Sequence, residues 1–156
     1  MEFTEITEKE YEKYWENHPL KTFMSAPKIA KLREKNNWKA YFVGVKENKK
    51  IIAAAMLLSH KRRFNVNEFY SPRGFLLDFN NKELLEFFVK EVKDFVHKHN
   101  GYVLRIDPYV IYKQRDINGD IVEDGLDNTP IVNHLKSLGF KKVPTNNMEQ
   151  VSWMFS

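Results

Sequence analysis

The feature that most constrains the fold of this chain is a long helical pattern followed directly by a strand pattern. Over residues 81–100 the apolar side chains recur on one helix face, and Asn100 with Gly101 supplies a helix stop. The recurring apolar residues are Leu84, Leu85, Phe88, Val92, Phe95 and Val96, and we expect them to pack in the core. Residues 102–107 then alternate between two faces, as in a strand. With an expected strand over residues 66–70, this predicts a strand, helix, strand unit with a right-handed crossover.

Asp107 stands where the second strand of this unit must end. Pro108 has no N–H for the sheet and biases Asp107 toward an extended conformation. In open α/β sheets the carboxyl ends of strands are where clefts and ligands are found, so Asp107 is a candidate site residue. Aspartate before proline is also a common turn starter, and the residues alone leave that interpretation open.

The other expected elements complete one fold. In order they are a strand (2–6), a helix from a Thr7 and Glu10 capping box to about Asn17, a helix (27–35), a hairpin (38–46 and 51–59), a short helix (130–137) and terminal strands after Gly139-Phe140. The hairpin's second strand is apolar throughout, which predicts burial on both faces. This is the element order of a GNAT-type acyltransferase, an α+β fold with a mixed, largely antiparallel sheet flanked by helices. Without a linker or repeat, we expect residues 1–156 to form a single domain.

Composition narrows the class of protein. The 156 residues include 42% hydrophobic residues and 12 Phe, enough for one core, and the formal charge of +4 is too mild to diagnose nucleic-acid binding. The absence of Cys excludes disulfides, thiolate metal sites and cysteine nucleophiles. Because the start lacks signal-peptide features and residues 51–58 form the longest apolar run, we expect a cytoplasmic protein with no transmembrane segment.

The turn before the long helix argues against coenzyme A. GNAT enzymes hold the pyrophosphate of acetyl-CoA on backbone N–H groups of a glycine-rich turn at that helix N-terminus. Here residues 71–79 contain one glycine and a bulky apolar run. We therefore expect a GNAT-like fold without CoA.

Other motifs favour structural interpretations. Residues 116–120 resemble the start of a calcium loop, but the glycine comes too early and no glutamate closes it, which favours a solvated turn. His97 and His99 lie on different helix faces and the other histidines are isolated, so we expect no metal site. The basic run from His60 to Arg63 suits phosphate binding, although a solvated hairpin loop is the simpler interpretation.

Three segments, in this order and spacing, resemble the Fem family, the FemABX peptidyltransferases. They are Lys35-Asn36-Asn37-Trp38, Tyr70-Ser71-Pro72-Arg73-Gly74-Phe75 followed by Asp78, and Tyr102-Val103-Leu104-Arg105-Ile106-Asp107-Pro108. The resemblance extends through Leu138-Gly139-Phe140. It implies transfer of an amino acid from aminoacyl-tRNA to the stem peptide of a nucleotide- or lipid-linked peptidoglycan precursor. Such bacterial cytoplasmic enzymes build the interpeptide bridges of the cell wall, and some confer β-lactam or methicillin resistance.

The resemblance also assigns roles to three residues. Lys35 matches a lysine that helps hold the precursor's nucleotide diphosphate, and Arg73 lies in the matching Arg-Gly turn, where a substrate contact is implied. Asp107 matches the aspartate at the head of the family's cleft, which orients the attacking amine or accepts its proton.

The resemblance covers only the first of the family's two GNAT-like halves. We therefore expect this chain alone to be inactive, with Trp153 and Phe155 either exposed toward a second half or closing the domain's own last strand. The alternative is a non-catalytic GNAT-like module that binds RNA or a protein partner through His60 to Arg63.

Overall fold

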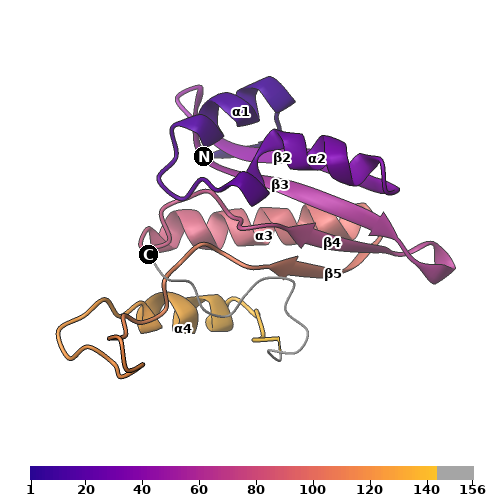
Figure 1. Cartoon of the computed structure of the whole chain (residues 1–156). Coiled ribbons are helices and arrows are strands. Elements are labelled where there is room, and N and C mark those ends of the chain that lie inside the picture. Colours follow the sequence, from indigo (N-terminus) through magenta and orange to yellow (C-terminus); the bar gives the residue numbers. More distant parts are fainter. Residues whose placement is uncertain (144–156) are drawn as a thin grey trace. The chain divides into compact units, whose positions relative to one another are not determined.

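A computed structural model of the chain describes residues 1–143 and confirms the GNAT-like α+β fold (Figure 1). The chain forms two compact units, residues 1–110 and residues 111–156. The first unit holds a five-stranded sheet and three α-helices, and the second holds one α-helix within its described part.

The strands of the first unit follow one another across the sheet in the order β1-β2-β3-β4-β5. They are β1 (Glu2–Glu5), β2 (Trp38–Glu47), β3 (Lys50–Lys61), β4 (Asn67–Ser71) and β5 (Gly101–Ile106); the helices are α1 (Glu8–Glu16), α2 (Pro27–Glu34) and α3 (Lys82–Lys98), with short 3-10 turns at Phe23–Ser25 and Arg63–Asn65. Neighbouring strands are antiparallel except β4 and β5, which are parallel and joined through α3. The predicted strand, helix, strand unit is confirmed.

Local sequence signals set the ends of the helices. The side-chain hydroxyl of Thr7 accepts the N–H of Glu10, and the Glu10 carboxylate accepts the N–H of Thr7, which confirms the capping box of α1. Pro27 opens α2, and the side chain of Asn81 caps α3 by accepting the N–H of Leu84. Each helix therefore begins where the sequence predicts.

Strand β3 is buried on both of its faces because an apolar layer packs on each face of the sheet. Ala54, Met56 and Leu58 pack in a cluster that includes residues of α1 and α2. On the opposite face, Phe3 of β1 contacts Phe88 and Phe95 of α3 at ring distances of 6.1 and 6.3 Å. Figure 1 shows α1 and α2 on one side of the strands and α3 on the other. This two-sided packing confirms the predicted burial of the second hairpin strand.

The second unit contains α4 (Thr129–Ser137), preceded by an acidic loop that is closed by isolated bridges. Lys113 pairs with Asp127 and Arg115 pairs with Ile121. The helix predicted over residues 130–137 is confirmed. Residues 141–143 form no strand, and the remainder of the predicted terminal strands, with Trp153 and Phe155, lies outside the described residues.

Candidate functional site

The parallel strands β4 and β5 end together at one end of the sheet. Ser71 lies opposite Ile106 in the register, so the residues that follow the two strands emerge side by side. A proline stops each strand soon afterwards, Pro72 after β4 and Pro108 after β5. The two predicted site residues of these turns, Arg73 and Asp107, are thereby brought together.

Arg73 contacts Asp107 through both its backbone and its side chain. The backbone N–H of Arg73 donates to Asp107 Oδ1 at 2.8 Å, and Arg73 Nε lies 3.8 Å from Asp107 Oδ2. Arg73 adopts a positive φ of 50°, and its guanidinium lies 5.8 Å from the centre of the Tyr109 ring. The side chains of Arg73 and Asp107 are 13% and 25% exposed, and Asp107 Oδ2 itself is buried. Such a group can hydrogen-bond or take a proton from a ligand amine.

Lys35 lies at the opposite end of the sheet. It is exposed at the C-cap of α2, three residues before Trp38 opens β2. Trp38 pairs with His60, which pairs with Glu68, which pairs with Val103 near the start of β5. Asp107 comes four residues later, roughly 13 Å farther along the strand at about 3.3 Å per residue. The structure therefore does not bring Lys35 and Asp107 together.

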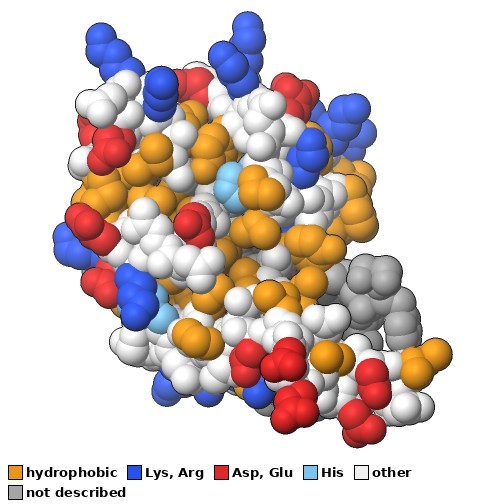
Figure 2. Space-filling model, turned by 90° about the vertical axis from the view of Figure 1, so that its left-hand side faces the viewer, with side chains coloured by type: hydrophobic (Ala, Val, Ile, Leu, Met, Phe, Trp, Pro, Cys, Tyr) orange, Lys and Arg blue, Asp and Glu red, His pale blue; other side chains and the backbone are white. Residues whose placement is uncertain are grey.

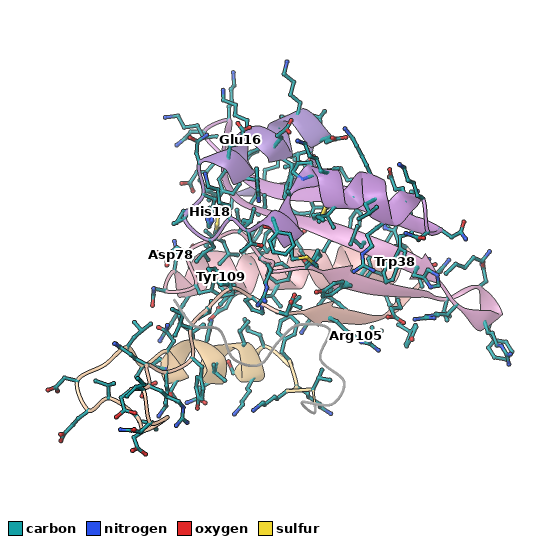
Figure 3. The ribbon with its side chains drawn as sticks, viewed as in Figure 1. Glu16, His18, Trp38, Asp78, Arg105 and Tyr109 are labelled. Carbon is teal, nitrogen blue, oxygen red and sulfur yellow. The ribbon has the colours of Figure 1, made fainter. Side chains whose placement is uncertain are left out.

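Burial perturbs two side chains at the C-terminal end of α1. The Tyr14 hydroxyl donates to the Ile52 carbonyl at 2.8 Å, and burial raises the pKa of Tyr14 to about 12. His18 accepts the N–H of Leu20 at Nδ1 and contacts the Tyr14 ring, and burial lowers the pKa of His18. Figure 3 shows His18 at the same end of this unit as Asp78 and Tyr109, with Trp38 at the other end.

Seen from outside, the side of the molecule on which β4 and β5 end shows hydrophobic side chains among polar and charged ones (Figure 2). In the upper part of Figure 2, hydrophobic side chains gather at the centre and lysines and arginines project from the upper edge. An apolar surface with a few convergent polar groups is the usual character of a ligand site.

Sequence reasoning missed a buried carboxylate, that of Glu68 in β4. Its side chain is 4% exposed, and its Oε2 lies 2.8 Å from both Nε and Nη2 of Arg62. Arg105 Nη1 approaches the other oxygen at 3.4 Å, and the Tyr102 hydroxyl lies 3.5 Å from Oε2. The available signal was a charged residue within an apolar strand, which requires a partner when it is buried.

The turn between β4 and α3 is packed into the protein. Phe75, Leu76 and Leu77 are fully buried, and Leu76 exchanges two backbone hydrogen bonds with Ala54. The N–H groups of Arg73 and Leu84 donate to the side chains of Asp107 and Asn81. These two donors are used internally, and the apolar run after Gly74 packs in the core.

Within residues 1–143 no group of three or more histidine and acidic side chains could hold a metal ion. No helix of the described chain has the length and apolar character needed to cross a membrane.

Comparison with known proteins finds relatives among the Fem aminoacyltransferases. The chain is 33% identical to the aminoacyltransferase FemA of Staphylococcus epidermidis over 142 residues, which cover 90% of this chain and 34% of that protein. It is 32% identical to FemB of the same species over 162 residues, covering 99% of this chain and 38% of that protein. The chain therefore spans about a third of the length of the curated relatives that it matches.

Two solved structures resemble this chain, one at 27% sequence identity and one at 12%. The crystal structure of FemX superposes with a TM-score of 0.74 and 27% identity over 90% of this chain and 32% of FemX. An aminoglycoside 6'-N-acetyltransferase from Acinetobacter haemolyticus gives a TM-score of 0.55 and 12% identity over 100% of this chain and 98% of that enzyme, which shows the fold alone. A sequence profile of the FemAB family matches residues 6–155, and the chain belongs to that family.

Proposed function

We propose that this chain forms the acceptor-binding part of an aminoacyltransferase that adds an amino acid to the stem peptide of a peptidoglycan precursor. The donor is aminoacyl-tRNA, and the products belong to the interpeptide bridges of the bacterial cell wall. The single observation that carries the proposal is the Asp107 carboxylate, held by Arg73 at the shared end of β4 and β5 in a FemAB-family chain. Cytoplasmic location and a part in β-lactam resistance remain predictions.

Asp107 supplies what ester aminolysis requires. The acceptor amine must be neutral to attack the ester carbonyl; a new C–N bond then forms, the ester C–O bond breaks and the tRNA hydroxyl leaves. The ammonium proton must pass to a base, and a carboxylate that is 25% exposed can orient the amine and accept that proton. Arg73 acts on this step through Asp107, as a positioning residue, by fixing the orientation of the carboxylate.

The separation of Lys35 from Asp107 suits an extended acceptor. A precursor that carries a diphosphate at one end and a peptide amine at the other needs recognition groups well apart. The exposed ammonium of Lys35 is a flexible point charge for the diphosphate. The partly buried carboxylate of Asp107 faces the amine, and no CoA is used because the turn after β4 does not fit one.

The test separates binding from transfer. Calorimetry with a nucleotide-linked precursor is run on this chain and on its Lys35→Ala and Asp107→Asn variants; we expect Lys35→Ala to weaken binding and Asp107→Asn to leave it nearly unchanged. Transfer from charged tRNA is measured in a chimeric FemB in which this chain replaces the matched third, since we expect the chain alone to transfer nothing.

The alternative is a non-catalytic module that binds RNA or a protein partner. It predicts no precursor binding by this chain and no loss of transfer when Asp107→Asn is placed in the chimera. Equal activity of the Lys35→Ala and Asp107→Asn chimeras would reject both proposed roles.

A further inference from the structure

The connection between β3 and β4 holds an aromatic side chain out in solvent. Phe64 is 95% exposed, and both Phe64 and Asn65 have a φ of 60°. This left-handed conformation costs free energy for a bulky residue and suits asparagine or glycine better. The Phe64 ring buries almost no surface within the described chain, so packing does not offset that strain. The combination indicates a contact outside the chain.

Backbone hydrogen bonds hold this turn in place. The Arg62 N–H donates to the Val66 carbonyl at 2.8 Å and closes the turn around Phe64. The Asn67 N–H donates to the Asn100 carbonyl at 2.8 Å, which attaches the start of β4 to the end of α3. In Figure 1 the connection projects past the end of the sheet at which β4 and β5 begin. A preorganised frame therefore presents Phe64 beyond the sheet.

The turn itself is basic. Lys61, Arg62 and Arg63 are exposed, and residues 60–67 contain no acidic residue. The nearest acid in the sequence, Glu68, is buried and pairs with Arg62 at 2.8 Å, so its charge is offset within the chain. The charges of Lys61 and Arg63 therefore remain to attract an anionic surface.

Two neighbouring elements extend this surface. Tyr102, at the start of β5, is 59% exposed and lines a hollow of about 400 Å³ together with Phe64. His97, near the end of α3, lines the same hollow, and Lys98, the next residue, is exposed. Exposed aromatic rings with cations close by are typical of surfaces that meet a bilayer, where rings lie at the headgroup level and cations meet anionic lipids.

We propose that the turn between β3 and β4 docks on an anionic lipid bilayer, with the Phe64 ring inserted at the headgroup level and Lys61 and Arg63 against lipid phosphates. The cations favour an anionic partner, and the projecting ring favours one that it can enter without a preformed pocket. An apolar anchor and a small basic cluster each bind weakly, and together they give reversible membrane binding. This docking goes beyond the proposed function and does not depend on it.

Cosedimentation of this chain with sucrose-loaded vesicles tests the docking. Vesicles of phosphatidylcholine with about 30% phosphatidylglycerol are compared with vesicles of phosphatidylcholine alone, at several salt concentrations. We expect the chain to bind the anionic vesicles at least about tenfold more tightly than the neutral ones. Binding should weaken as the salt concentration rises, because salt screens the attraction between the basic turn and the lipid charges.

Variants separate the ring from the charges. Phe64→Asn removes the ring, keeps a residue that tolerates the left-handed conformation, and should weaken binding about fivefold or more, whereas Phe64→Trp should bind at least as tightly as the parent chain. Arg63→Gln should weaken binding about fivefold. Its matched control is Lys82→Gln, at the other end of α3 and roughly 24 Å along the axis from Lys98. Lys82→Gln and Phe23→Asn, at a side chain that is 76% exposed, should each stay within about twofold of the parent chain.

Several results would overturn the inference. They are absence of binding at low salt, equal binding to neutral and anionic vesicles, equal losses in test and control variants, or a loss in Arg63→Gln with none in Phe64→Asn, which would indicate adsorption without insertion. Binding of a soluble protein or nucleic acid through this turn, with no binding of vesicles, would also overturn it. Thermal midpoints confirm that the variants fold. Failure of the proposed function is distinguishable, because the vesicles contain no precursor and the assay has no transfer step.

Discussion

Two carboxylates, that of Glu68 on β4 and that of Asp107 just after β5, have similar partners but different surroundings. Asp107 contacts the guanidinium and accepts the backbone N–H of Arg73, and its side chain is 25% exposed. Glu68 has two guanidiniums and a tyrosine hydroxyl within 3.5 Å, and its side chain is 4% exposed. The difference teaches that pairing with arginine does not define a site; access for a ligand does. We therefore assign chemistry to Asp107 and a structural role to Glu68.

The largest effect on stability is expected from truncating Phe88, a core side chain near the end of the sheet that carries Asp107. Phe88 is fully buried and its ring lies 4.9 Å from that of Phe75, which follows the Arg73-Gly74 turn. Phe88→Ala should lower the free energy of unfolding by about 3–5 kcal/mol, because it leaves a cavity. Urea denaturation measures this, with Phe88→Leu as a control that should cost less than about 1.5 kcal/mol. A near-neutral Phe88→Ala would contradict the packing of α3.

The second prediction tests the chemical role that the comparison assigns to Asp107. In the FemB chimera, Asp107→Asn should lower kcat about 100-fold, which is within the usual range for losing a general base. Its effect on the free energy of unfolding of this chain should stay below about 1 kcal/mol, since the amide still accepts the Arg73 N–H. If Asp107→Asn lowered the free energy of unfolding by as much as it raised the activation free energy of transfer, Asp107 would be a structural residue like Glu68.

The third prediction tests the structural role that the comparison assigns to Glu68. Glu68→Gln should lower the free energy of unfolding by about 1–2 kcal/mol, because a buried, charge-assisted hydrogen bond becomes a weaker one while Arg62 and Arg105 return to water. The cost stays modest because the guanidinium-bearing side chains are 48% and 45% exposed. Denaturation of Glu68→Gln beside Glu16→Gln, an exposed control, measures it. Transfer by the chimera should be retained once the variant is folded.

The smallest effect concerns an exposed carboxylate, Glu10. Hydrogen bonds from Lys46 and from Thr7 lower the pKa of Glu10 from 4.5 to about 2. Because the folded pKa is below the unfolded one, this stabilisation is present above about pH 4.5 and is lost as the pH falls toward about 2. Thermal midpoints between pH 6 and pH 2 should fall less in Glu10→Gln than in the parent chain. Parallel curves would show that the charge of Glu10 adds nothing.

Local signals explain what could be predicted from the sequence. The capping box at Thr7, the periodicity of α3 and the proline after Asp107 each depend on residues a few positions apart. Their physical effect is correspondingly local, so helices, strands and the candidate Asp107 could be identified before the structure. The roles of Lys35, Arg73 and Asp107 remain predictions.

The features that could not be predicted from the sequence depend on contacts between residues that are distant in the chain. Arg105 reaches Glu68 across 37 positions of sequence, and the exposure of Phe64 beside Tyr102 depends on how β4 begins against the end of α3. No periodicity indicates either arrangement. The distance between Lys35 and Asp107 likewise required the strand register, because the resemblance gives each residue a role without saying how far apart they lie.

The position of β5 has a consequence for motion. Among the described residues β5 has a strand on one side only, whereas β3 lies between two strands and two apolar layers. Amide hydrogens of β3 should exchange with solvent only on global unfolding, and those of β5 through smaller openings of lower free energy. Each such opening withdraws the segment that carries Asp107 from the Arg73 N–H. The carboxylate can thus be released and recaptured while the rest of the sheet stays folded.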